Sequence, residues 1–206
     1  MEIKGTMKIR TMDEFSYYNK TVLLRTDINS PIDTISKKIT NNNRLKMSAK
    51  TIKEILEQGG KLAIIAHQGD TLDYHNLIPL VEHAKILSDL VGIEIKYIDD
   101  VAGPAAQEMV RKLKPGEGVL LGNLRYLTEE VSTFENYVKL DPIQMQDTYL
   151  VRNLAPLCDY YINDAFAAAH RSSPSMIGFQ EILPSAGGRL LIAEVNALLK
   201  IMKTPI

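Results

Sequence analysis

Short apolar segments with the length of β-strands alternate along this chain with longer segments that have helical periodicity. The strand-like segments are residues 21–26, 61–67, 93–99, 118–122 and 159–163. The helix-like segments are residues 44–59, 80–92, 105–114 and 142–157. Strands joined by helices of this length form right-handed crossovers, which produce a mostly parallel sheet covered on both faces. The predicted fold is an α/β, Rossmann-like three-layer sandwich, followed at 187–206 by a helix that leaves the sheet.

Four of the apolar segments run directly into polar side chains. These are Arg25, Asp27 and Asn29; His67 and Gly69; Asn123 and Arg125; and Asn163, Asp164, His170 and Arg171. Open α/β sheets bind ligands at the carboxyl ends of their strands, so these groups are expected to meet at one edge of the sheet. Arginine and histidine beside amide and carboxylate groups indicate a site for a small, strongly anionic ligand.

Composition excludes several other classes of protein. With 206 residues, 45% apolar and 24% charged, the chain is long enough for one large globular domain. Its net charge of −1 gives no general attraction to nucleic acid or to an anionic membrane. The single cysteine, Cys158, excludes an intrachain disulfide or a multi-cysteine metal site. The chain has no apolar run of about 20 residues and no signal-peptide core, so we expect a cytoplasmic protein.

Four stretches resemble one family closely. VLLRTDINSPID resembles VLVRVDFNVPLD, and residues 41–69 resemble DDTRIRAALPTIKYLLEKGAKVILLSHLG. LGNLRYLTEE resembles LENVRFHPEE, and YINDAFAAAHRSSPSMIGF resembles YVNDAFGTAHRAHASTVGI. The family is phosphoglycerate kinase, in its archaeal type, and the resemblance runs in the family's order through nearly all of residues 15–200.

The resemblance implies a division of labour between domains. Residues 1–187 would form the N-terminal phosphoglycerate-binding domain, and residues 188–206 would begin the helix between the domains. The family's C-terminal domain, which holds Mg²⁺ with ATP or ADP, is absent from this sequence. The whole enzyme transfers a phosphoryl group reversibly between 1,3-bisphosphoglycerate and ADP in glycolysis and gluconeogenesis. This chain alone is expected to be inactive as a kinase, and the family suggests a monomer with no metal on this half.

The resemblance also assigns roles to the polar side chains. The implied contacts to 3-phosphoglycerate are Arg25, Asp27, Asn29, Arg44, His67, Gly69, Arg125, His170 and Arg171. A phosphate monoester beside a carboxylate requires several guanidinium groups, each of which can bind two oxygens. Arg44 is the implied catalytic residue, because its family equivalent stabilises the charge on the migrating phosphoryl group. The acceptor carboxylate is already ionised, so no general base is required.

Some of these side chains have simpler interpretations. His67 and His170 could be structural hydrogen-bonding histidines, and Asp27 could serve only to orient Arg25. His75 and His83 are interpreted as surface or packing residues. The pair at 129–130 is interpreted as solvated glutamates.

Two positions depart from the family pattern. Asp70 stands where the family has a basic residue, and Gly122 replaces the glutamate of the family's LEN. An acid facing a dianionic ligand would weaken binding. Either Asp70 turns outward, which we favour, or the substrate differs. The alternatives are a paralogue that acts on another acyl phosphate and a non-catalytic domain that binds an anionic metabolite.

Overall fold

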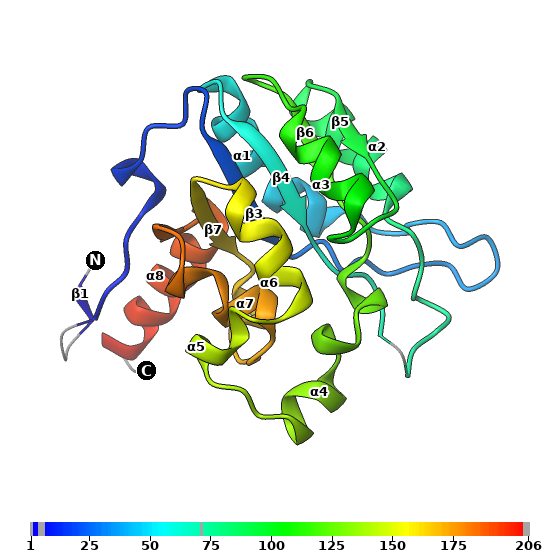
Figure 1. The fold of residues 1–206 in the computed structure, drawn as a ribbon. Helices are drawn as coiled ribbons and strands as arrows, with labels where there is room; N and C mark the ends of the chain where they lie inside the picture. The colour runs from blue at the N-terminus through cyan, green and yellow to red at the C-terminus, as the bar shows by residue number, and fades with distance from the viewer. Residues whose placement is uncertain (1, 4–6, 71, 204–206) are drawn as a thin grey trace.

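The computed structural model describes residues 2–3, 7–70 and 72–203, and its centre is one six-stranded sheet (Figure 1). The strands are β3 (Thr21–Thr26), β4 (Lys61–Ile65), β5 (Ile95–Tyr97), β6 (Gly118–Leu120), β7 (Tyr160–Asp164) and β8 (Ser185–Gly187). They are all parallel, in the order β5-β6-β4-β3-β7-β8. A separate antiparallel pair joins β1 (Glu2–Ile3) and β2 (Met7–Lys8). The predicted α/β fold with a parallel sheet is confirmed.

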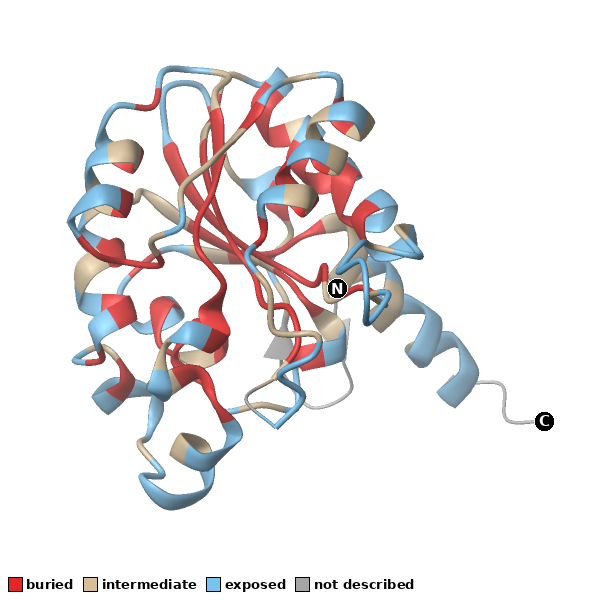
Figure 2. Ribbon diagram, turned by 90° about the vertical axis from the view of Figure 1, so that its right-hand side faces the viewer, coloured by how far each residue is buried: buried red, intermediate tan, exposed pale blue. Residues whose placement is uncertain are grey.

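Helices cover both faces of this sheet. On one face lie α1 (Asn43–Glu57) and α2 (Val81–Val91), packed on Val22 and Leu24 of β3. On the other face lie α3 (Pro104–Arg111) and α6 (Tyr149–Leu154), packed in a second cluster that contains Leu23. Successive side chains of a strand point to opposite faces, so β3 contributes to both clusters. Figure 2 shows the buried strands between helices whose outer sides are exposed.

Shorter elements complete the structure. The short α-helices are α4 (Ser132–Tyr137), α5 (Pro142–Met145) and α7 (Pro174–Ile177). The 3-10 turns are η1 (Met12–Glu14), η2 (Leu124–Tyr126), η3 (Thr128–Glu130), η4 (Ala155–Leu157), η5 (Phe166–Ala168) and η6 (Phe179–Glu181). Turn η2 follows β6 and turn η5 follows β7, so both lie at the carboxyl edge of the sheet.

The prediction of one continuous helix over 142–157 is wrong. The segment forms α5, α6 and η4, with a break between α5 and α6. The carboxylate of Glu129 explains the break, because it accepts hydrogen bonds from the backbone N–H groups of Tyr149 (3.0 Å) and Leu150 (2.6 Å). A side-chain acceptor at this position satisfies N–H groups that a continuous helix would bond internally. Glu129 is therefore a helix cap and not a merely solvated residue.

Helix α8 (Arg189–Lys203) is anchored at its first turn and then leaves the sheet. The buried carboxylate of Asp164, at the end of β7, accepts a hydrogen bond from Leu191 N (3.0 Å). Arg189 donates to Glu54 of α1 through Nε (2.8 Å). The last turns of α8 project from the body (Figure 2), and Ile201 and Met202 are exposed. The predicted final helix is confirmed over these residues, while 204–206 lie outside the described part of the chain.

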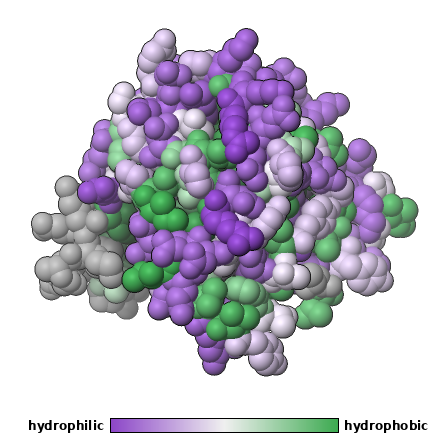
Figure 3. Space-filling model, in the orientation of Figure 1, coloured by the Kyte–Doolittle hydropathy of each residue, from purple (hydrophilic) through white to green (hydrophobic). Residues whose placement is uncertain are grey.

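The surface shows no large apolar face in the view of Figure 3. Hydrophilic residues predominate there, and the hydrophobic ones form separate patches. Exposed apolar side chains such as Ile35, Tyr74 and Tyr137 lie on different segments of the chain. Within the described residues, no helix is both long enough and apolar enough to cross a membrane.

Candidate anion-binding site

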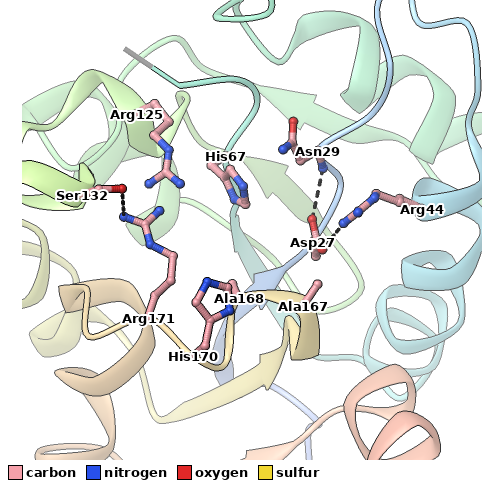
Figure 4. A pocket seen from close by; sticks show the side chains of 10 residues that line it. All are labelled: Asp27, Asn29, Arg44, His67, Arg125, Ser132, Ala167, Ala168, His170 and Arg171. Carbon is pink, nitrogen blue, oxygen red and sulfur yellow. Dashed lines mark hydrogen bonds and ion pairs between the residues drawn. The ribbon is translucent and has the colours of Figure 1, made fainter. Parts of the chain in front are cut away.

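A pocket of about 320 Å³ opens at the carboxyl ends of β3, β4 and β7 (Figure 4). Its lining consists of Asp27, Asn29, Arg44, His67, Arg125, Ser132, Ala167, Ala168, His170 and Arg171. Seven of the nine predicted contact residues are in this lining, and the exceptions are Arg25 and Gly69. Residues as far apart in the sequence as Asp27 and Arg171 thus meet because parallel strands end at the same edge.

Arg25 lies behind the pocket wall and does not line the pocket. It shares a face of β3 with Leu23, and its side chain is only 2% exposed. Its Nη2 donates to Nδ1 of His67 at 2.9 Å, and its Nε donates to Oγ of Ser175 at 3.2 Å. Burial lowers the pKa of Arg25, a shift that the negative charge of Glu130 opposes. The predicted direct contact between Arg25 and a ligand is therefore revised to support of the wall from behind.

His67 is a neutral histidine that lines the pocket. Burial, followed by the positive charges of Arg25, Arg125, Arg171 and Arg44, holds the pKa of His67 well below its ordinary value. Because a guanidinium group only donates, Nδ1 accepts the hydrogen bond from Arg25 and the ring proton is on Nε2. His67 therefore has a structural hydrogen bond on one side and a donor on the other.

Arg44 and Asp27 form an ion pair at the pocket mouth. Arg44 is the second residue of α1, and its side chain is 49% exposed, whereas the side chain of Asp27 is 7% exposed. Asp27 also accepts a hydrogen bond from the backbone N–H of Asn29 at 3.3 Å. The alternative that Asp27 serves only to orient Arg25 is therefore replaced by a direct pairing with Arg44.

Gly69 supports the pocket through its backbone. Its N–H donates to Oδ1 of Asn29 at 3.1 Å, and its carbonyl oxygen accepts from Nε of Arg125 at 3.4 Å. Gly69 has a φ of +70°, and a Cβ at this position would lie 2.4 Å from the backbone carbonyl of Asn76. Only glycine fits here without a shift of the 73–77 segment. The prediction that Gly69 belongs to the site is thus explained by local packing.

Asp70 neither lines the pocket nor turns fully into solvent. Its Oδ2 lies 3.6 Å from Nε of Arg125, and its side chain is 35% exposed. Arg125 also donates from Nη1 to the carbonyl oxygen of Glu130. The outward orientation that we expected is therefore only partly correct. Asp70 reduces the positive charge of the site through an arginine that lines it.

Arg171 and His170 follow η5 and lie across the pocket from Arg44 (Figure 4). The Nη2 of Arg171 pairs with the carboxylate of Glu135 and lies 3.4 Å from Oγ of Ser132, both on α4 (Figure 4 shows the contact with Ser132). Nη2 is also 3.4 Å from the carbonyl oxygen of Glu130. His170 lines the pocket and is exposed. Helix α4, which the sequence analysis did not identify, therefore closes one side of the site.

Glu130 is the main site residue that sequence reasoning missed. It is 1% exposed, and its carboxylate accepts from Ser175 N (2.6 Å) and Ser175 Oγ (2.7 Å). The interpretation of Glu130 as solvated is wrong. The signal that could have identified Glu130 as a site residue is its position in LGNLRYLTEE, the stretch that resembles the family.

Two further buried polar residues brace the loops around the pocket. Gln68 accepts a hydrogen bond from Ser30 N at 2.8 Å through Oε1, which also lies 3.0 Å from Nε2 of His83. Burial lowers the pKa of His83 to about 4, so this histidine is neutral at pH 7. The interpretation of His83 as a packing residue is confirmed. Among the described residues, no group of three or more histidine, cysteine, aspartate or glutamate side chains is placed to hold a metal ion.

Comparisons with known proteins agree with the fold. The family model described as phosphoglycerate kinase matches residues 12–206. The phosphoglycerate kinase of Sulfurisphaera tokodaii is 47% identical over 95% of this chain and 45% of its own length. The phosphoglycerate kinase of Methanothermus fervidus is 44% identical over 95% of this chain and 46% of its own length.

A solved structure gives the same result. The crystal structure of phosphoglycerate kinase from Pyrococcus horikoshii superposes with a TM-score of 0.86 at 38% identity. The superposition covers 96% of this chain and 47% of that one, so the chain spans about half the length of the relatives that it matches. With the match over residues 12–206, the chain belongs to the phosphoglycerate kinase family.

Proposed function

We propose that this chain is the substrate-binding half of a phosphoglycerate kinase and holds 3-phosphoglycerate or 1,3-bisphosphoglycerate. The observation that carries the proposal is the convergence of Arg44, Arg125, Arg171 and His67 on one pocket. Guanidinium groups bind phosphate and carboxylate oxygens in pairs, and a neutral histidine adds a further donor. A ligand with an anionic group at each end of a short carbon chain fits such a lining.

Arg44 is the proposed catalytic residue. Besides the main pocket, it lines a second pocket of about 230 Å³ between α1, η5 and α8. A side chain between two adjacent pockets can stabilise charge on a phosphoryl group that passes from one to the other. Mg²⁺ with ATP or ADP would supply the phosphoryl group, bound by a nucleotide domain that lies outside this sequence. We assign residues 1–187 to the substrate domain and 188–206 to the helix between domains, because the sheet ends with β8 and α8 begins at Arg189.

A second candidate, action on another acyl phosphate, is favoured by one observation. Asp70 places a carboxylate beside Arg125, where the family pattern has a basic residue. The Asp70 carboxylate reduces the positive charge that is available to bind a highly anionic substrate. Cytoplasmic location and a monomeric state are proposed on the family resemblance alone.

Calorimetry with 3-phosphoglycerate, and with glycerate as the control that lacks the phosphate, tests the substrate. We expect weak, salt-sensitive binding of 3-phosphoglycerate and no detectable binding of glycerate, because glycerate keeps the carboxylate but lacks the phosphate group that most of the guanidinium donors would bind. A coupled assay should detect no ATP-dependent phosphorylation by this chain alone. Absence of binding would contradict the proposed substrate, and kinase activity would contradict the proposed division between two domains.

Replacing Asp70 with asparagine should strengthen the binding of 3-phosphoglycerate. Loss of a partly exposed charge beside Arg125 is expected to raise affinity by about three- to tenfold at low salt, and by less at high salt. Asp89→Asn, an exposed change on α2, serves as the control. Equal affinities for wild type and Asp70→Asn would show that the carboxylate does not influence the pocket.

A further inference from the structure

A buried chain of hydrogen bonds runs behind the pocket wall from Arg25 to Glu130. Arg25 and Glu130 are 2% and 1% exposed, and they carry opposite charges. The hydroxyl of Ser175 lies between them, 3.2 Å from Nε of Arg25 and 2.7 Å from Oε2 of Glu130. Buried ions require such partners, because burial without compensation is costly for either charge. Neither Arg25 nor Glu130 lines the pocket.

The direction of these hydrogen bonds follows from the chemistry of the groups. A guanidinium group only donates, so Oγ of Ser175 accepts from Arg25 and directs its own proton to Glu130. The backbone N–H of Ser175 donates to the other carboxylate oxygen at 2.6 Å. Both carboxylate oxygens of Glu130 are thus held by a single residue, which fixes the position of the glutamate.

The main chain of Glu130 serves the same site. Its carbonyl oxygen accepts from Nη1 of Arg125 and lies 3.4 Å from Nη2 of Arg171. Both arginines line the pocket. One residue therefore orients two pocket arginines with its backbone, and its side chain is linked through Ser175 to Arg25 behind the wall.

Beyond Arg25, the hydrogen bonds continue to His67. Nη2 of Arg25 donates to Nδ1 of His67, so the side-chain position of Arg25 selects the tautomer with the proton on Nε2. The charged groups that act on His67 are the cations Arg25, Arg125, Arg171 and Arg44. Behind this wall lies the carboxyl group of Glu130, whose pKa is raised by burial, a shift that the positive charges of Arg25 and Arg125 oppose.

We propose that Glu130 is a positioning residue of the anion pocket. Through Ser175 and Arg25 it fixes His67 as a neutral donor at Nε2, and through its carbonyl group it fixes Arg125 and Arg171. The donors that meet an anion are thus oriented before the ligand arrives. Such preorganisation strengthens binding because less ordering is required when the complex forms.

The test compares Glu130→Gln with Glu129→Gln in the full chain. Glu129 is the adjacent glutamate, and its carboxylate caps α6 without a contact to the pocket arginines. The nitrogen chemical shifts of the His67 ring, measured by NMR without ligand, report which nitrogen carries the proton. We expect the Nε2–H tautomer in wild type and in Glu129→Gln, and a mixture of tautomers in Glu130→Gln. A purely structural role of Glu130 would not change this signal.

The second measurement is affinity for inorganic phosphate and for 3-phosphoglycerate, and it rests on the proposed function. We expect Glu130→Gln to bind both at least about tenfold more weakly than Glu129→Gln, since misplaced donors lose charge-assisted bonds. If wild type binds neither anion, the proposed function fails while the tautomer result still decides the role of Glu130. A Glu130→Gln variant with the wild-type tautomer and wild-type affinity would overturn the inference.

Ser175→Ala tests the same proposal if Glu130→Gln does not fold. It removes only the bridging hydroxyl and retains both charges and the backbone N–H of residue 175. We expect a mixture of His67 tautomers in this variant as well. A folded Ser175→Ala protein with an unchanged tautomer and unchanged phosphate affinity would refute the chain from Glu130 to His67.

Discussion

Replacing Arg25 with methionine should lower the free energy of unfolding by about 3–5 kcal/mol, because the change removes the positive charge of Arg25, which stabilises the buried Glu130 carboxylate more than that of Arg125 does. Methionine fills most of the space of the arginine stem, so the loss should come mainly from the missing charge and hydrogen bonds. Urea denaturation followed by circular dichroism measures it. Arg111→Met on the exposed surface of α3 is the matched control, with an expected change within about 0.5 kcal/mol.

The double variant Arg25→Met/Glu130→Gln separates charge from packing. Removing both charges should recover part of the stability that Arg25→Met loses, since no uncompensated ion is left in the interior. The coupling energy of the cycle is expected to be at least about 1 kcal/mol. Strict additivity of the two single changes would contradict the electrostatic link between Arg25 and Glu130.

Replacing Arg171 with alanine should weaken the binding of 3-phosphoglycerate by about 1.5–3 kcal/mol, the range for charge-assisted hydrogen bonds. Arg44→Ala and Arg125→Ala are expected to fall in the same range. Arg125→Ala should also lose stability, since Arg125 is buried and holds both Gly69 and Glu130. Titration calorimetry gives the affinities, and thermal unfolding shows whether each variant is folded.

Lys85→Ala is the control for these arginine variants, because Lys85 is exposed on α2 and does not line the pocket. If Arg44→Ala and Arg171→Ala bind as tightly as Lys85→Ala, the pocket is not the binding site. A loss confined to Arg44→Ala would instead place the ligand at the mouth of the pocket.

The position of the site could be predicted from the polar residues that directly follow apolar strands. An apolar strand followed by polar residues identifies the edge where Asp27, His67 and Arg171 meet, because all strands of a parallel sheet end on one side. The local sequence does not show which of these polar side chains face the pocket. Arg25 follows the alternation of β3 to the face that carries Leu23, and there Ser175 accepts a hydrogen bond from Arg25 and Tyr161 donates one to the carbonyl oxygen of Ser175.

Other features were hidden because they depend on contacts between distant segments. Glu130 is held in the interior by Ser175, 45 residues later in the chain, and apart from the stretch that resembles the family no local pattern indicates its burial. The break between α5 and α6 depends on Glu129, twenty residues earlier than the helix that it caps. Strand β8 consists of three small residues, too few for a periodic signal.

The position of β3 in the sheet has a consequence for how the protein folds. Strand β3 pairs with β4, where Thr21 lies opposite Lys61, 40 residues later in the sequence. It also pairs with β7, where Val22 lies opposite Tyr160, 138 residues later. Closing the longer loop costs more chain entropy and depends on residues that leave the ribosome late. The β3–β7 pairing also brings Asp27 and Arg171 to opposite walls of one pocket. Anion binding should therefore emerge in the last cooperative step of folding, together with the completed sheet.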